Sequence, residues 1–122
     1  LEGLLTVDPR FEQVAIIADG YKFVSALIYP NWEVLRREAA ERGVSRDLSE
    51  EELSKQHEVH RLVMAHVEAA LSSVAQYEKV KKFHLMTTPF TLESGELTNT
   101  LKLRRKVVAE HYASEIAHMY EE

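Results

Sequence analysis

The sequence predicts an α+β fold in which a small three-stranded sheet, made of a hairpin plus a third strand, is packed with helices. Three observations predict it. Two β-branched, apolar runs flank an Asp-Gly dipeptide, two stretches with apolar residues at three- and four-residue spacing follow, and a third strand-like run precedes a final helical stretch. Such runs are typical of strands and such spacing is typical of helices. The order strand, strand, helix, helix, strand, helix indicates a sheet covered by helices.

Length and composition narrow the class of protein. The 122 residues suffice for one hydrophobic core and are too few for two, so we expect residues 1–122 to form a single domain. The net charge of −5 argues against nucleic-acid binding, which requires a basic face. The absence of cysteine excludes disulfides and thiolate metal sites. The start at Leu1 has no signal-peptide pattern and suggests a piece of a longer protein, with a cytoplasmic origin as the default.

The amino-terminal quarter is expected to form a short helix and a β-hairpin. Glu2–Val7 is compatible with a helix, which Asp8-Pro9 ends because the residue before proline is pushed out of the α region. Phe11–Ala18 and Lys22–Tyr29 are strand-like, and the second is apolar on both faces, as a covered central strand would be. Asp19-Gly20 between them suits a tight hairpin turn with positive φ.

The next helix has a clear start and a clear end. Pro30 is expected to stop the strand ladder, and Asn31 is a good N-cap because its side chain accepts hydrogen bonds from free amides of the first turn. Trp32–Arg42 is then predicted to be helical, and Gly43 ends it because glycine adopts positive φ freely.

A second helical stretch begins at a capping box. Ser49 and Glu52 have the spacing in which each side chain bonds the other's backbone amide. The stretch is expected to continue to about Ala75, with a break near Lys55-Gln56 left open. Its apolar stripe, expected to face the core, comprises Val59, Leu62, Val63, His66, Val67, Ala70, Leu71 and Val74.

The last third of the chain contains a strand, a polar loop and a helix. Tyr77–Lys82 turns the chain, Val80–Thr88 is predicted to be the third strand, and Pro89-Phe90 ends it. The loop Ser94–Arg105 follows, and the terminal helix is expected from Leu103 or Arg104 to Tyr120.

This loop is the one stretch dense in groups suited to anion chemistry. It holds a turn glycine, hydroxyl groups, and Lys102 followed by Arg104 and Arg105. A lysine on a loop is a flexible positive charge that can meet phosphate or carboxylate oxygens. Composition by itself favours the alternative that Lys102 is a solvated surface lysine and that Arg104–Lys106 merely open a basic helix.

The other candidate constellations favour structural roles. His57 and His60 are three residues apart and share a helix face, but no third ligand stands at a recognisable spacing, so we expect no metal site. His66 is expected to be a hydrogen-bonded residue at the core edge. No nucleophile-elbow, Walker or dinucleotide-binding pattern is present. A lone lysine cannot supply a nucleophile, a base and an oxyanion site together, so any chemistry needs groups from elsewhere.

Three segments carry a family resemblance. They are Asp8–Asp19 followed by Lys22–Asn31, then Tyr77–Phe83, and finally Phe90–Val108 with its Thr-Asn-Thr-Leu-Lys-Leu-Arg-Arg run. In this order they resemble the hairpin, the entry to the third strand and the last core motif of the carboxy-terminal subdomain of adenylate-forming enzymes. The resemblance is strongest to bacterial long-chain fatty acid–CoA ligases, and it covers nearly the whole chain.

The resemblance implies a two-step reaction. A carboxylate attacks the α-phosphate of ATP with Mg²⁺, giving an acyl-adenylate; the small domain then rotates about a hinge and the thiol of coenzyme A attacks the adenylate. In the family a lysine of the last motif acts in the first step, and by position it is Lys102, whose implied role is to stabilise developing negative charge. Thr100, Arg104 and Arg105 are further candidates for contacts with phosphates of ATP or coenzyme A.

The resemblance also implies partners. The amino-terminal large domain of the same chain would hold the nucleotide pocket and the acyl tunnel, with a fatty acid as substrate. The fragment alone is expected to be inactive and to bind no cofactor. Peripheral association of the full enzyme with the inner membrane face is left open.

Two residues depart from the family pattern, and two alternative functions remain open at this point. Leu101 stands where much of the wider superfamily has glycine, as it does in the long-chain subgroup, and Asn99 stands where that subgroup commonly has proline. The alternatives are an acyl-AMP ligase or another carboxylate-activating enzyme of the superfamily, and a non-catalytic interaction domain that keeps the fold.

Overall fold

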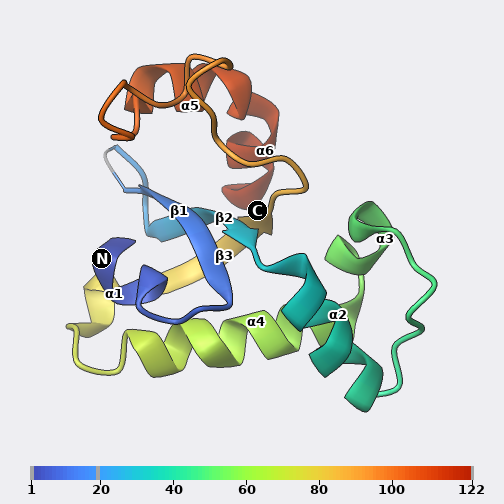
Figure 1. The fold of residues 1–122 in the computed structure, drawn as a ribbon. Coiled ribbons are helices and arrows are strands. Elements are labelled where there is room, and N and C mark those ends of the chain that lie inside the picture. Colours follow the sequence, from blue (N-terminus) through green and yellow to red (C-terminus); the bar gives the residue numbers. More distant parts are fainter. Residues whose placement is uncertain (1, 19, 122) are drawn as a thin grey trace.

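A three-stranded sheet lies between two groups of helices in the computed structural model, which describes residues 2–18 and 20–121 (Figure 1). The strands are β1 (Phe11–Ile17), β2 (Val24–Pro30) and β3 (Val80–Leu85), in the order β1-β2-β3. β1 is antiparallel to β2, whereas β3 is parallel to it, with Ala26 opposite Phe83. A parallel pair needs a long crossover, which the helices between β2 and β3 provide. The predicted α+β fold is confirmed.

The central strand β2 is covered on both faces, as its apolar sequence predicted. Ala26 and Ile28 point into one hydrophobic cluster and Leu27 into another, and all three are fully buried. The first cluster lies under the helices α1 (Glu2–Thr6), α2 (Trp32–Glu41), α3 (Glu50–Ser54) and α4 (His57–Ala70). The second lies under α5 (Arg105–His111) and α6 (Ala113–Met119).

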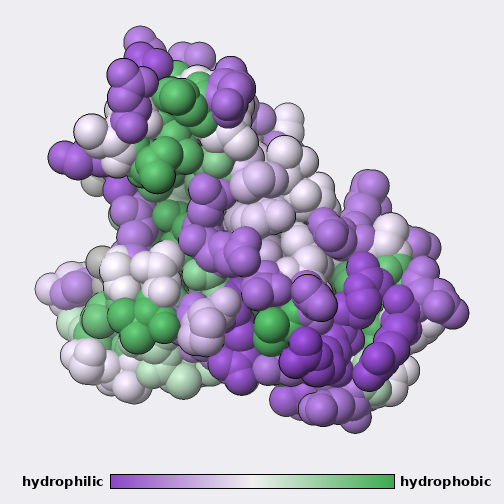
Figure 2. All heavy atoms as spheres, in the orientation of Figure 1, coloured by the Kyte–Doolittle hydropathy of each residue, from purple (hydrophilic) through white to green (hydrophobic). Residues whose placement is uncertain are grey.

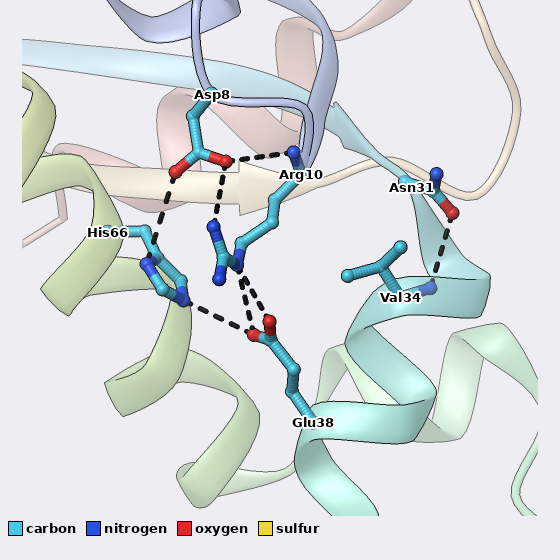
Figure 3. Close-up of polar contacts among 6 residues, drawn as sticks. All are labelled: Asp8, Arg10, Asn31, Val34, Glu38 and His66. Atoms are coloured by element: carbon cyan, nitrogen blue, oxygen red, sulfur yellow. Dashed lines mark hydrogen bonds and ion pairs between the residues drawn. The ribbon is translucent and has the colours of Figure 1, made fainter.

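The predicted helix starts are confirmed. The Asn31 side chain accepts a hydrogen bond from the amide of Val34 at 3.2 Å (Figure 3). Ser49 and Glu52 form the reciprocal capping box, with N–O distances of 3.1 and 2.9 Å. Gly43 has a φ of +90°, as a residue that ends a helix with positive φ should. These features were predictable because each partner lies within one turn in the sequence.

Several predicted boundaries are corrected by the structure. Pro30 is the last residue of β2, paired with Phe11, and so does not stop the ladder before itself. A proline is tolerated there because the missing amide lies at the end of the strand. The break near Lys55-Gln56 is present, but α4 ends at Ala70, and turns and the 3₁₀ helix η1 (Gln76–Glu78) follow.

Two further boundaries differ. The terminal helix is broken at Tyr112 into α5 and α6, although no glycine or proline marks the break. The paired residues Ile17 and Ser25 flank a connection longer than the tight turn predicted for Asp19-Gly20. Gly20 has the expected positive φ of +81°, whereas Asp19 lies outside the described residues.

An ionic cluster joins the turn between α1 and β1 to the helices α2 and α4 (Figure 3). The Nε atom of Arg10 donates to both carboxylate oxygens of Glu38, at 3.1 and 2.8 Å, and its Nη1 atom donates to Asp8 at 3.1 Å. Burial alone would lower the pKa of Arg10, but hydrogen bonds to Glu38 and Asp8 outweigh burial and raise it. His66 completes the cluster, with Nε2 3.3 Å from Glu38, which confirms its predicted place at the core edge.

None of the helices in the described part of the chain has the length and apolar character needed to cross a membrane.

Candidate functional site

The loop after β3 folds into a small hairpin. Leu97 and Leu103 form an antiparallel bridge, and the Thr98 amide donates to the Lys102 carbonyl at 2.8 Å. The tip is closed by the amide of Leu101, which donates to the Thr98 carbonyl at 2.8 Å. Leu97 is buried and Leu103 packs against the same cluster, so the hydrophobic core anchors the hairpin stem. The backbone of this loop is therefore fixed, although it belongs to no named strand.

Lys102 has a fixed backbone and an exposed side chain. Its amide donates to the Thr98 hydroxyl at 3.1 Å, beside the bond that its carbonyl accepts from the Thr98 amide. Among residues 2–18 and 20–121, no hydrogen bond or ion pair involves its ammonium group. Thr100 lies at the same tip, where its hydroxyl is 3.1 Å from that of Thr98. The structure thus brings Lys102 and Thr100 together.

Leu101 adopts a conformation that its sequence did not reveal. Its φ is +62°, and it is the only residue other than glycine with positive φ in the described part of the chain. A side chain in this left-handed region costs roughly 1–2 kcal/mol because Cβ crowds the following carbonyl. Leu101 is also 70 % exposed, so burial of its side chain does little to offset the strain. A glycine at this position would adopt the same φ without this strain.

The two arginines behind the lysine have different surroundings. Arg104 is exposed and precedes the first turn of α5, and its side chain has no partner among the described residues. The Nη2 atom of Arg105 donates to both carboxylate oxygens of Glu2, at 2.7 and 2.9 Å. Its Nη1 atom donates to the carbonyl of Ile16 at 3.3 Å. Arg105 therefore ties α5 to α1 and β1, and its predicted phosphate contact stays a prediction.

A hollow lies beside this tie, between the α5 and α1 regions (Figure 2). It has a volume of about 420 Å³ and is lined mainly by apolar side chains, among them Ile17, Leu103 and Val108. Glu2 and Arg105 also line it. Figure 2 shows hydrophobic surface over both helices that border the hollow, in contrast to the hydrophilic surface toward α2.

The base of the hairpin carries a group that sequence reasoning missed. Glu96 is 5 % exposed, and one carboxylate oxygen accepts a hydrogen bond from the Ser94 hydroxyl at 2.8 Å. The other oxygen lies 2.9 Å from Nδ1 of His111 on α5. In the sequence Glu96 sits in a polar loop, where a carboxylate is normally solvated. No local signal marks its burial.

The arrangement offers electrostatic stabilisation and little else. Lys102 presents a positive charge, but no nucleophile and base stand beside it. Within the described ranges, no group of three or more His, Asp or Glu side chains is placed to hold a metal ion. The Nε2 atom of His60, considered above as a ligand, instead donates to the Ser54 carbonyl at 2.6 Å, and its ring stacks on Phe83. The site can stabilise an anion that is supplied from outside the domain.

The similarity of this chain to known proteins indicates one family. The model of the family described as AMP-binding enzyme C-terminal domain matches residues 1–122. A long-chain-fatty-acid–CoA ligase of Mycobacterium tuberculosis is 32 % identical over 120 residues, which are 98 % of this chain and 20 % of that protein. A long chain acyl-CoA synthetase of Arabidopsis thaliana is 36 % identical over 101 residues, 80 % of this chain and 15 % of that protein. The chain thus spans about a fifth or less of the length of these relatives.

Solved structures show the same fold. The adenylation domain of a carboxylate reductase from Mycobacterium chelonae superposes with a TM-score of 0.76 at 24 % identity, over 98 % of this chain and 17 % of that one. A didomain of a carboxylic acid reductase from Segniliparus rugosus, solved in complex with AMP, gives 0.75 at 20 % identity, over 98 % and 15 % of the chains. Because the family model matches residues 1–122, this chain belongs to the AMP-binding enzyme C-terminal domain family.

Proposed function

We propose that this chain is the mobile carboxy-terminal domain of a long-chain fatty acid–CoA ligase, and that Lys102 acts in the adenylation step. The observation that carries the proposal is the contrast within Lys102 itself. Its backbone is held by two hydrogen bonds to Thr98, whereas its ammonium group has no ion pair in the described part of the chain. A rigidly mounted, unsatisfied charge suits an anion that arrives from another domain.

In this proposal Lys102 stabilises charge and does not attack. ATP supplies the α-phosphate that the substrate carboxylate attacks, and pyrophosphate leaves. Lys102 places its ammonium where negative charge gathers, between the carboxylate oxygen and the oxygens of the α-phosphate. Such a preorganised donor lowers the barrier because the charge it meets is greatest in the transition state.

The residues present fit part of a nucleotide site. Lys102, the Thr100 hydroxyl and the exposed Arg104 would face the phosphates, since all three lie on the hairpin or at its end. Arg105 is engaged by Glu2 and would need to exchange partners to join them. Mg²⁺ would be held by groups outside this domain, because the described residues provide no cluster of ligands for it.

The second step of the proposed reaction requires the hairpin to leave. We propose that the whole domain rotates against the amino-terminal large domain, which removes Lys102 and opens the adenylate to the thiol of coenzyme A. A single chain that supplies one lysine can serve only one half-reaction at a time, which accounts for the need to move. The enzyme is proposed to act in the cytoplasm.

The test is Lys102→Ala in the full-length enzyme, with the two half-reactions measured separately. Adenylate formation, followed by pyrophosphate release, should fall about 10²- to 10³-fold, as for loss of one preorganised donor. Thioester formation from supplied acyl-adenylate should be nearly unchanged. Lys106→Ala is the matched control, because Lys106 is an exposed lysine of α5 that should affect neither step. Equal loss in both half-reactions would overturn the assignment.

A second candidate is an acyl-AMP ligase that transfers its product to a carrier protein. It is favoured by the structural likeness to the didomain of a carboxylic acid reductase. Adenylation would depend on Lys102 in the same way, so the acceptor distinguishes the two. Supplying coenzyme A or a phosphopantetheinylated carrier protein to the enzyme with preformed adenylate identifies which thiol is used. A non-catalytic domain, in contrast, predicts that Lys102→Ala leaves the activity unchanged.

A further inference from the structure

We propose that Glu96 and His111 form a positioning pair that fixes the register of the hairpin and thereby the placement of Lys102. The proposal rests on the proposed function of Lys102 in adenylation. It adds two residues that do not touch the reacting atoms and act through the hairpin.

The first observation is the burial of a charge. Glu96 is the only buried ionisable side chain in the described part of the chain, at 5 % exposure. Taking a carboxylate out of water is strongly unfavourable unless it is paired and hydrogen-bonded. Here one oxygen accepts from Ser94 and the other is 2.9 Å from Nδ1 of His111. A buried carboxylate held by two specific partners admits one arrangement of those partners and disfavours others, although His111 itself is exposed.

The second observation is where the pair sits. The carbonyl of Glu96 accepts a hydrogen bond from the Arg104 amide at 2.8 Å. The next rung is the bridge between Leu97 and Leu103, and the one after it is the bond from the Thr98 amide to the Lys102 carbonyl. Glu96 is therefore at the base of a three-rung ladder whose last rung is Lys102.

The third observation concerns the position of His111, the residue that contacts Glu96. His111 lies on α5, which begins at Arg105, directly after the returning arm of the hairpin. The contact between Glu96 and His111 thus joins the outgoing arm of the hairpin to the helix that continues its returning arm. A slip by one residue in either arm would break this contact and would turn Lys102 to the opposite face of the ladder. Burial of the Glu96 carboxylate penalises such a slip, because the charge would lose its partner.

The experiment measures both half-reactions of the full-length enzyme for His111→Ala and Glu96→Gln. Displacing a catalytic group by about 1 Å can cost roughly 10²-fold in rate, so adenylation should fall roughly 10- to 100-fold. Thioester formation from supplied acyl-adenylate should be unchanged. His111→Asn should recover most of the adenylation rate, because the Asn amide can donate near the position of Nδ1.

A double-mutant cycle separates positioning from general structure. If His111 acts through Lys102, His111→Ala should cause no further loss of adenylation in the Lys102→Ala background. His118→Ala is the matched control, since His118 is an exposed histidine of α6 paired with the exposed Glu121. It should change neither half-reaction. Unfolding by urea, followed for each variant, shows whether a variant is folded; Glu96→Gln keeps the side-chain volume should His111→Ala fail to fold.

The outcomes distinguish the two proposals. Loss of adenylation in Lys102→Ala but normal adenylation in folded His111→Ala and Glu96→Gln would overturn the positioning pair alone. The positioning pair would also be overturned if His111→Ala slowed both half-reactions equally. It would be overturned as well if His111→Ala reduced the adenylation rate as much in the Lys102→Ala background as in the otherwise unchanged enzyme. Normal adenylation in Lys102→Ala would overturn the proposed function, and the positioning role with it.

Discussion

Arg10 and Lys102 are cations in two regions of one small fold, and only the side chain of Arg10 has hydrogen-bond partners in the described part of the chain. Arg10 lies between the start of β1 and α2, where Glu38 and Asp8 accept its hydrogen bonds and His66 completes the cluster (Figure 3). Lys102 lies at the tip of a hairpin on the other side of the sheet, with its ammonium unpaired among the described residues.

The difference teaches how a charge inside one domain can be assigned to structure or to function. Each charged side chain of the Arg10 cluster has a partner within the domain, so we assign the cluster a structural role. The Lys102 hairpin has its backbone and its base satisfied, by Thr98 and by Glu96, while the charge at its end is not. The Lys102 ammonium, which has no partner in the described part of the chain and is carried by a hydrogen-bonded backbone, is available to a partner outside the domain.

The largest effect on stability is expected from the Arg10 cluster. Glu38→Ala removes two charge-assisted hydrogen bonds from a partly buried guanidinium, and it should lower the free energy of unfolding by about 2 kcal/mol. Lys102→Ala removes a side chain that has no hydrogen bond or ion pair with residues 2–18 and 20–121, and it should change the free energy of unfolding by less than about 0.5 kcal/mol. Urea denaturation compares the two variants. Equal destabilisation would break the contrast between the two regions.

A smaller effect is expected at the tip of the hairpin. Leu101→Gly should raise the free energy of unfolding by about 0.5 kcal/mol, because relief of the left-handed conformation exceeds the entropy that glycine adds to the unfolded chain. Leu92→Gly is the matched control, at an exposed leucine without positive φ, and it should destabilise. Thermal unfolding measures both. A destabilising Leu101→Gly would show that the tip is not strained.

The smallest effect is expected from a histidine on the hairpin side of the sheet. His84 is half-buried beside Tyr112, and burial lowers its pKa below the usual value. Between the pKa of His84 in the folded chain and its pKa in the unfolded chain, the unfolded chain binds more protons. The free energy of unfolding should therefore fall as the pH drops below about 6.5. His84→Gln should lessen this fall, whereas His57→Ala, at an exposed site, should not. Urea midpoints at several pH values measure the slope; an identical slope in His84→Gln would contradict the prediction.

The parts of the fold that could be predicted are those specified within a few residues. Asn31 and Ser49 cap helices through partners three residues away, and the burial of β2 on both faces follows from its own apolar run. The parallel pairing of β3 depends on the path of the intervening helices, and no local pattern contains it. The break at Tyr112, whose ring lies edge-on against Phe90, could not be predicted because no glycine or proline marks it in the sequence.

The candidate site also has features that could be predicted from the sequence and features that could not. Residue chemistry indicates that the loop is suited to anions, but the proposal that Lys102 is the residue that acts there depends on the family resemblance. The positive φ of Leu101 could not be predicted, because leucine normally avoids that region. The contact between Glu96 and His111 depends on how the hairpin folds back on α5, which their positions in the sequence do not reveal.

The tie between Glu2 and Arg105 has a structural consequence. One carboxylate binds the guanidinium of α5 and also accepts the amide of Ile16 at 2.8 Å, so three elements from opposite ends of the chain meet at a single side chain. This carboxylate therefore connects the amino-terminal helix directly to the first turn of α5, which follows the hairpin that carries Lys102.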